Sequence, residues 1–220
     1  MRADAQRNRE KLLRAAREVF VDLGPDAPLE EIAQRAGVGI ATLYRRFPER
    51  AALIAAVATD VLTALGRAAW SALSEETDPA EGLRRYAHAA LDLKVGAVMP
   101  ALSGRFDLDE VLDGVHGDAV DAVQEMLTRA QRAGLIRDDA AFGDISLMIV
   151  RLSRPLPGGV VPYDDALAHR QLDLYLDGLR APGADRPAGG PPGPAIDADG
   201  FKALRSRIAG SSATDRGPDA

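Results

Sequence analysis

The sequence contains no cysteine and only 3 histidines in 220 residues. Without thiols the chain can form no disulfide framework, no thiolate zinc site and no cysteine nucleophile, and it suits a reducing cytoplasm. His88, His116 and His169 are far apart in the sequence, and none has another histidine four residues away to share a metal ion on one helix. We therefore expect no metal site and no cofactor.

Enzyme motifs are missing as well. The chain has no G-x-S-x-G nucleophile elbow, no Walker loop and no dinucleotide-binding fingerprint. Adjacent acids such as Asp138 with Asp139, and Asp164 with Asp165, stand where helices are expected to begin, so capping and the helix dipole account for them. The pattern favours a protein that is not an enzyme.

Long apolar runs are also scarce. No apolar stretch follows the charges of the N-terminal MRADAQRNRE, so this is not a secretory signal, and no run reaches the roughly 18 apolar residues of a spanning helix. We expect a soluble, cytoplasmic protein with no membrane partner. The net charge of -6 is uneven, because residues 1–50 hold 10 Lys and Arg against 8 Asp and Glu, and the remainder 17 against 25. A slightly basic end on an acidic body suits docking to nucleic acid by that end.

Helical periodicity runs through most of the chain. Apolar residues spaced by three and four predict helices over 9–24, 28–37, 40–47 and 49–70, and then over 79–101, 107–115, 117–134, 140–154 and 164–180. No alternating pattern predicts a strand, so the expected fold class is all-α. From Ala181 onward proline and glycine replace apolar residues, and we expect a disordered tail over 183–220.

The stretch EEIAQRAGVGIATLYRRFPERAAL, residues 30–53, places two short helical patterns around a Gly-Val-Gly turn. This is a helix-turn-helix arrangement, whose second helix can enter the DNA major groove, about 12 Å wide. Small Ala33 permits a close helix crossing, and Leu43 and Phe47 should point inward. The outward residues offer hydroxyl and guanidinium donors and short apolar groups that suit phosphates and base edges. They are Ile40, Ala41, Thr42, Tyr44, Arg45 and Arg46.

The segments NREKLLRAAREVFVDLG and PLEEIAQRAGVGIATLYRRFPERAALI resemble the TetR family of bacterial transcriptional regulators over about residues 7–58, and QLDLYLDGLRA is similar to the last helix of one branch. The resemblance implies a homodimer with a three-helix DNA-binding domain, here 1–50, and a helical effector-binding and dimerisation domain, here 51–182. It places Thr42, Tyr44, Arg46 and Arg50 on operator phosphates, and Ile40, Ala41 and Arg45 near base edges.

Two residues depart from the family pattern. Gly39 stands where a serine often caps the recognition helix, and Ala41 stands where glycine is usual. A glycine at the cap has no side chain that could accept a hydrogen bond from the helix N-terminus, and an alanine changes how closely the backbone approaches a base. These departures bear on which bases are recognised, not on how the helix docks.

Candidate effector-binding residues are large or adaptable side chains that can line a cavity between helices, and polar side chains that can orient a ligand. The same residues also suit an ordinary core or a solvated surface. The set comprises Trp70, His88, Asp92, Met99, Phe106, Met126, Met148 and Arg151.

Apolar stripes on the last two expected helices suit a dimer seam built as a four-helix bundle of two hairpins. The stripes could equally pack inward, and it is the resemblance that favours a dimer. The candidate interface residues are Ile145, Ile149, Leu152, Leu172, Tyr175, Leu176 and Leu179.

The sequence therefore predicts a DNA-binding transcriptional regulator, a repressor that a small molecule releases from a palindromic operator. One alternative is a regulator of the same fold without a small-molecule effector. Another, from a different class, is a helical enzyme or carrier that uses the C-terminal cavity.

Overall fold

The structure, a computed structural model, describes residues 2–106, 111, 119–154, 164–181 and 196–203, with side chains from residue 6 onward. Its described residues fall into two compact units. The first holds residues up to Thr63 with 97–106 and Val111, and the second holds 64–96 and the described residues from Ala119 to Ala203. The first part of the fourth helix, up to Thr63, thus groups with the N-terminal helices, whereas the domain boundary predicted at residue 50 stays a prediction.

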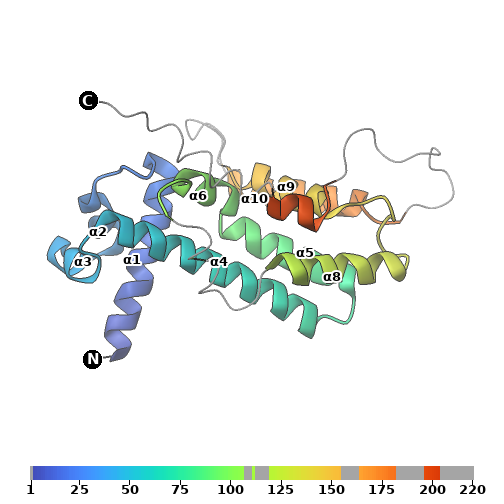
Figure 1. The fold of residues 1–220 in the computed structure, drawn as a ribbon, viewed down its shortest axis with the longest axis horizontal. Helices are drawn as coiled ribbons and strands as arrows, with labels where there is room; N and C mark the ends of the chain where they lie inside the picture. The colour runs from blue at the N-terminus through green and yellow to red at the C-terminus, as the bar shows by residue number, and fades with distance from the viewer. Residues whose placement is uncertain (1, 107–110, 112–118, 155–163, 182–195, 204–220) are drawn as a thin grey trace. The chain divides into compact units, whose positions relative to one another are not determined.

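The described elements are helical, as the periodicity predicts, and no strand occurs among them (Figure 1). Ile136 and Arg180 form an isolated antiparallel bridge. The helices are α1 (Arg2–Leu23), α2 (Leu29–Ala36), α3 (Ile40–Arg46), α4 (Arg50–Glu75), α5 (Pro79–Asp92), α6 (Val95–Leu102), α8 (Ala119–Arg132), α9 (Phe142–Leu152) and α10 (Asp164–Gly178). The helix predicted over 107–115 lies outside the described residues, except for Val111.

The first unit is built on the buried stripe of α1. Val19 and Phe20 are fully buried, and so are Ile32 of α2, Leu43 of α3 and Leu53 of α4 in the same unit. Burying a side chain of this size contributes about 1.5–3 kcal/mol, so a few such contacts fix how short helices cross. This core holds the two short helices of the predicted helix-turn-helix in place.

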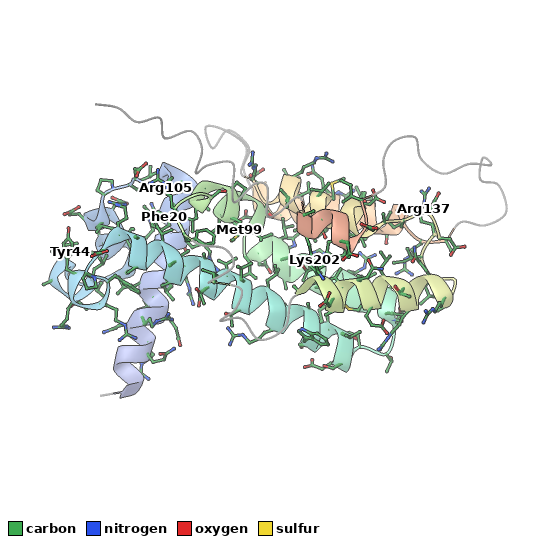
Figure 2. The ribbon with its side chains drawn as sticks, in the orientation of Figure 1. Phe20, Tyr44, Met99, Arg105, Arg137 and Lys202 are labelled. Carbon is green, nitrogen blue, oxygen red and sulfur yellow. The ribbon has the colours of Figure 1, made fainter. Side chains whose placement is uncertain are left out.

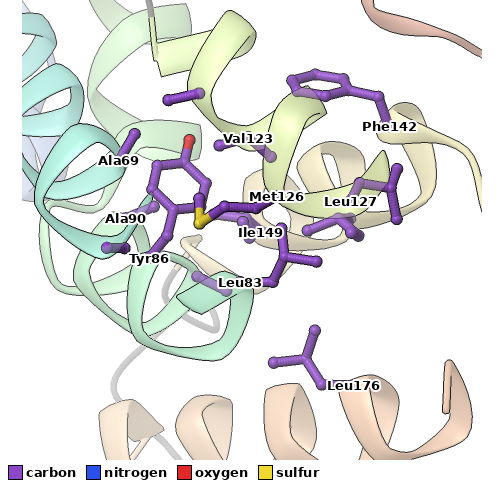
Figure 3. Packing of buried hydrophobic residues seen from close by; sticks show 14 of the residues in the cluster. Ala69, Leu83, Tyr86, Ala90, Val123, Met126, Leu127, Phe142, Ile149 and Leu176 are labelled. Carbon is purple, nitrogen blue, oxygen red and sulfur yellow. The ribbon is translucent and has the colours of Figure 1, made fainter. Parts of the chain in front are cut away.

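The second unit has its own core, shown in Figure 3. Leu83 and Tyr86 of α5 meet Met126 of α8, with Ile149 from α9 and Leu176 from α10 completing the cluster. A Cβ on Gly82 would lie 3.0 Å from the Met126 sulfur, so the missing side chain lets α5 and α8 approach closely. The core explains why α5, α8, α9 and α10 pack as one body.

One predicted helix is wrong in its length. The helix expected over 79–101 ends at Asp92, and α6 begins only at Val95. Lys94 makes the break by adopting a φ of 51°, an uncommon conformation for a residue with a Cβ. Pro100 lies inside α6, and lacking an N–H it cannot bond the carbonyl of Gly96. The Arg154 Nε donates to that carbonyl instead, at 3.2 Å.

Within the predicted tail, the structure describes residues 196–203, which include a short helical stretch. The Gly143 N–H donates a hydrogen bond to the carbonyl oxygen of Ile196 at 2.7 Å, which brings the segment directly onto the start of α9. The Phe201 ring meets Phe142 edge-on at 5.1 Å between centroids, and Lys202, labelled in Figure 2, pairs with Asp121 of α8 at 2.7 Å. A few apolar and charged residues beyond the Pro/Gly stretch are enough to hold the segment there.

The expectation that no stretch could span a membrane also needs correction. By length and composition alone α4 qualifies, since an 18-residue window within it has a mean hydropathy of 1.5. Core helices of soluble proteins meet the same criterion, and 39% of that window is buried in the protein. The many alanines of α4, rather than a continuous run of large apolar residues, raise its hydropathy.

Candidate nucleic-acid interface and effector domain

The turn between α2 and α3 depends on Gly37. Its φ of 67° is in the left-handed region, which glycine enters without strain, and its N–H bonds the Gln34 carbonyl at 3.0 Å. Val38 N–H closes the same turn on the Ala33 carbonyl. Gly39 then starts α3 without a side-chain cap, as the sequence predicts. The backbone therefore forms a compact helix-turn-helix in the first unit.

The sides of α3 are divided as the sequence predicts. Leu43 is fully buried and Phe47 nearly so, whereas Tyr44, Arg45 and Arg46 are exposed. Tyr44 keeps 46% of its surface exposed and points away from the helix in Figure 2. Of the other candidates, Ala41 is exposed, and Ile40 and Thr42 are half-buried.

Arg45 and Arg46 make no hydrogen bond or ion pair with any described residue. Two exposed guanidinium groups without an internal partner keep all their donors for an external acceptor. Phosphates and the guanine edge are acceptors that the guanidinium fork matches. The face of α3 thus has the geometry and charge of a DNA-contacting surface.

Arg50 differs from these two arginines. Its Nη1 donates to the carbonyl oxygens of Pro25 and Ala27, at 3.0 and 2.8 Å. Asp26, which lies between these two residues in the sequence, accepts hydrogen bonds from both terminal nitrogens of Arg105 at 2.7 and 2.6 Å. The loop from α1 to α2 is therefore held by the start of α4 and by the residues after α6. Sequence reasoning missed this role because the acceptors are backbone carbonyls.

Another arginine ties α2 to α1. Arg35 lies 2.6 Å from the carboxylate of Asp22 and 3.4 Å from that of Glu31. The hydrogen bond to Asp22, together with the charge of both acids, raises the pKa of Arg35. This arginine is therefore occupied in positioning the helix, and it is not free to face DNA as Arg45 and Arg46 are.

The predicted effector-binding residues are divided between the two units and differ in burial. Met126 is 1% exposed within the core, whereas Trp70 is 44% exposed and Arg151 lies at the surface. Met148 is half-buried in the second unit. Met99, labelled in Figure 2, and Phe106 are half-buried and belong to the first unit.

His88 and Asp92 of that set come together through His169. The rings of His88 and His169 lie nearly parallel, with 4.9 Å between centroids and 9° between planes. Distance in sequence had hidden this pair. A signal was available, since each histidine has an aspartate four residues later, Asp92 and Asp173, which puts a histidine and an acid on one face of each helix.

A small cavity of about 60 Å³ lies beside this pair in the second unit. It is lined by Leu91, Asp92, Lys94, Leu152, Ser153, Asp164, Asp165, Ala168 and His169. Lys94 pairs with Asp165 at 2.8 Å within it. Nowhere in the described part of the chain do three potential metal ligands converge on one point.

Most predicted dimer-interface residues belong to the subunit's own core. Five of the seven are almost completely buried within it, namely Ile145, Ile149, Leu172, Leu176 and Leu179. Leu152 and Tyr175 are half-buried against that core. The apolar stripes of α9 and α10 pack inward, which was the other reading of the same periodicity. On α10 the exposed apolar residues are Leu167 and Leu174.

The described residues form a helix-turn-helix that rests on a buried core, and a second helical unit. This is the architecture of a DNA-binding transcriptional regulator. Residues 12–57 match the family described as bacterial regulatory proteins, tetR family. Residues 78–181 match the family described as transcriptional regulator SbtR-like, C-terminal domain. The chain belongs to the TetR family of transcriptional regulators.

Individual relatives agree. The chain is 32% identical over 137 residues to an uncharacterized helix-turn-helix regulator of Mycobacterium bovis, covering 60% of this chain and 70% of the relative. It is 34% identical over 133 residues to the transcriptional repressor LfrR of Mycolicibacterium smegmatis, covering 57% and 66%. Among solved structures, a TetR regulator of Streptomyces coelicolor is 35% identical with a TM-score of 0.52, covering 80% of this chain and 99% of that one.

The structure of LfrR in complex with proflavine is 24% identical, with a TM-score of 0.55, and covers 78% of this chain and 95% of that one. At that identity it bears on the fold alone. The relatives are regulators, and none of those described above is an enzyme.

Proposed function

We propose that this protein is a cytoplasmic repressor that binds a palindromic operator through α3 and leaves it when a small molecule binds the second unit. The observation that carries the proposal is the exposed face of α3, where Arg45 and Arg46 have no partner among the described residues. An arginine without an internal partner at this position of a helix-turn-helix is available for phosphate and base contacts.

The test begins with the DNA that the protein selects. Fragmented genomic DNA is incubated with the purified full chain, and the retained fragments are sequenced. A palindrome with half-sites about one 10 bp turn apart, or a multiple of it, is the expected result. Loss of that enrichment in the double variant Arg45→Ala and Arg46→Ala, with the melting temperature unchanged, supports α3 as the reader. Retention of the same fragments by the double variant contradicts it.

The proposal of a small-molecule effector rests on a relative. LfrR, to which this chain is 34% identical over 133 residues, has been solved with proflavine, and this supports a ligand-responsive regulator here. The cavity of about 60 Å³ is far below the roughly 300 Å³ of a pocket for a drug-sized molecule. This cavity would have to widen to accept a molecule of that size. A compound that releases the operator and is recovered chemically unchanged supports a regulator over an enzyme.

The same small cavity favours a second candidate, a TetR regulator without a small-molecule effector. The two candidates are separated by screening compounds for a rise in melting temperature and for release of the selected DNA. Release without chemical change supports the first. Constant DNA affinity across a broad library, with expression of the target genes governed by protein abundance alone, supports the second.

The proposed homodimer uses α9 and α10, but through different residues from those predicted. Leu174 is 60% exposed and Leu167 is 40% exposed, seven positions apart on α10. Large exposed leucines repeating on one helix face suit an isologous contact in which each subunit offers the same stripe. Light scattering should give a dimer mass for the parent and a monomer mass for Leu174→Lys. A monomeric parent at micromolar concentration contradicts the proposal.

A further inference from the structure

Helices α5 and α10 face each other through a set of polar side chains, here called the α5–α10 ladder. It consists of three residues spaced by four on each helix, Arg84, His88 and Asp92 on α5 and His169, Asp173 and Asp177 on α10. Arg84 bonds both Asp173 and Asp177. The two histidines occupy the middle of the ladder.

The carboxylates fix the tautomers of both histidines. His88 Nε2 lies 2.9 Å from Asp173 Oδ1, and His169 Nε2 lies 2.9 Å from Asp92 Oδ1. Because an ionised carboxylate only accepts hydrogen bonds, each Nε2 must carry a hydrogen and donate it. A neutral imidazole has one N–H, so each neutral ring would then present a bare Nδ1.

Those two Nδ1 atoms lie 2.6 Å from each other. Two lone pairs repel at that distance, and two N–H groups would collide, but one hydrogen between the nitrogens makes a short hydrogen bond. The two rings together then carry three hydrogens, one more than two neutral rings hold. The geometry thus fits a pair with a single positive charge.

The surrounding charges favour protonation of the histidine pair. On α5 the neighbours are Arg84, Asp92 and, at the helix end, Lys94, which is paired with Asp165. On α10 they are Asp173 and Asp177. From the end of α9, Arg154 is committed to a carbonyl oxygen. With Lys94 and Asp165 offsetting each other, Asp92, Asp173 and Asp177 together with Arg84 leave a net charge of -2 beside the histidine pair, so the surroundings favour protonation, and it is the 2.6 Å distance between the Nδ1 atoms that leaves room for one hydrogen only.

Asp173 is the most strongly held acid of this group. The hydrogen bond from His88, followed by that from Arg84, holds the pKa of Asp173 below its usual value. It therefore stays ionised throughout the range in which histidine titrates, and it keeps the His88 Nε2–H as a donor.

We propose that His88 and His169 hold one shared proton that fastens α5 to α10, so that this contact is strongest over a narrow pH range and is lost on both sides of it. Loss of the proton leaves two lone pairs in contact. Gain of a second proton places two N–H groups and two positive charges face to face. The second unit would thereby respond to pH, whether or not it binds a small molecule.

The sign of the effect follows from counting protons. Two histidines in an unfolded chain titrate near pH 6.5, so they hold two protons at acidic pH and none at alkaline pH. The folded pair holds one. Below about pH 6.5 the unfolded chain binds more protons, so stability rises with pH, and above it the folded chain binds more, so stability falls. The coupling between the two histidines must therefore peak in the middle.

The test is a double-mutant cycle in the full chain. The urea unfolding equilibrium is measured for the parent, His88→Gln, His169→Gln and the double variant at about pH 5, 6.5 and 8. Both side chains are partly exposed, 26% and 30%, so we expect the coupling to change that equilibrium about fivefold at the middle pH and less than about twofold at either end. Arg85→Gln, which alters α5 outside the ladder, is the matched control and should show no coupling to His169→Gln.

Other outcomes overturn the proposal. Equal coupling at the middle and the high pH identifies an ordinary bond between neutral rings. Coupling that disappears with EDTA and returns with Zn²⁺ identifies a metal ion between the nitrogens. If a variant does not fold, proton NMR of the otherwise unaltered chain carrying His116→Gln decides the matter. A strongly deshielded N–H at the middle pH, absent at the high pH, supports the shared proton, and its absence throughout overturns it.

Discussion

Replacing Arg50 by alanine should destabilise the DNA-binding unit rather than only weaken a contact with DNA. The parent guanidinium donates two hydrogen bonds to backbone carbonyls, at 3.0 and 2.8 Å, in a half-buried position. A hydrogen bond from a charged donor contributes about 1.5–3 kcal/mol net, and water can replace part of each at a half-exposed site. We therefore expect Arg50→Ala to lower the free energy of unfolding by about 2 kcal/mol.

The assay is urea unfolding beside DNA binding, for Arg50→Ala, Arg50→Lys and Arg46→Ala. Lysine keeps the charge but lacks the planar fork, so its stability should lie between those of the parent and the alanine variant. Arg46→Ala is the matched control, an exposed arginine without an internal partner, and should lose affinity at unchanged stability. If Arg50→Ala unfolds at the parent's urea midpoint and loses affinity for all DNA as Arg46→Ala does, Arg50 is a phosphate contact and the reasoning fails.

Three further results are expected. Arg46→Ala should weaken binding to operator and random duplex alike and reduce the slope of log affinity against log salt by about 0.9 per subunit. Arg45→Ala should instead lose about 1–3 kcal/mol of discrimination between the two duplexes. Salt titrations of both variants test this assignment, and the reverse pattern contradicts it. Phe201→Ala should lower the melting temperature, because it removes an edge-on ring contact that contributes about 0.5–1.5 kcal/mol beyond its buried area. Lys202→Ala removes a partly exposed ion pair and should change the melting temperature little. An unchanged melting temperature for a chain ending before Ile196 would show that the segment does not dock. Burial raises the pKa of Tyr175 to about 12, so the folded chain keeps a proton that the unfolded chain releases from pH 10 upward, and stability should fall as the pH rises from 10 to 12. Tyr175→Phe should remove that part of the loss. In the folded parent, Tyr175 should not contribute to the tyrosinate absorbance that appears near pH 10.

Local patterns predicted the helix-turn-helix well, because everything that defines it lies within a few residues. Gly37 supplies the left-handed turn, and Leu43 and Phe47 supply the buried side of α3. The family is confirmed on the same segment. The roles of individual residues on α3 remain predictions, since burial and lack of internal partners show availability rather than contact.

Features that depend on distant residues were not predictable in this way. Lys94 breaks a helix without the usual glycine or proline, and Arg50 finds backbone carbonyls 23 and 25 positions away. An apolar stripe gives the same periodicity whether it faces its own core or a second subunit, which is why Ile149 and Leu172 were assigned to a dimer seam. Sequence separation likewise concealed a histidine pair 81 positions apart.

The α5–α10 ladder also restricts which alignment of the two helices can form during folding. Partly exposed polar contacts of this kind contribute little net stability, so their main effect is on the choice between competing arrangements. In the observed alignment Asp92 meets His169. A slip of α10 by one turn in one direction would bring Asp92 opposite Asp165, and a slip in the other direction would bring it opposite Asp173, in each case a carboxylate against a carboxylate. An apolar seam between the same helices would accept either slip at small cost, whereas this one penalises both.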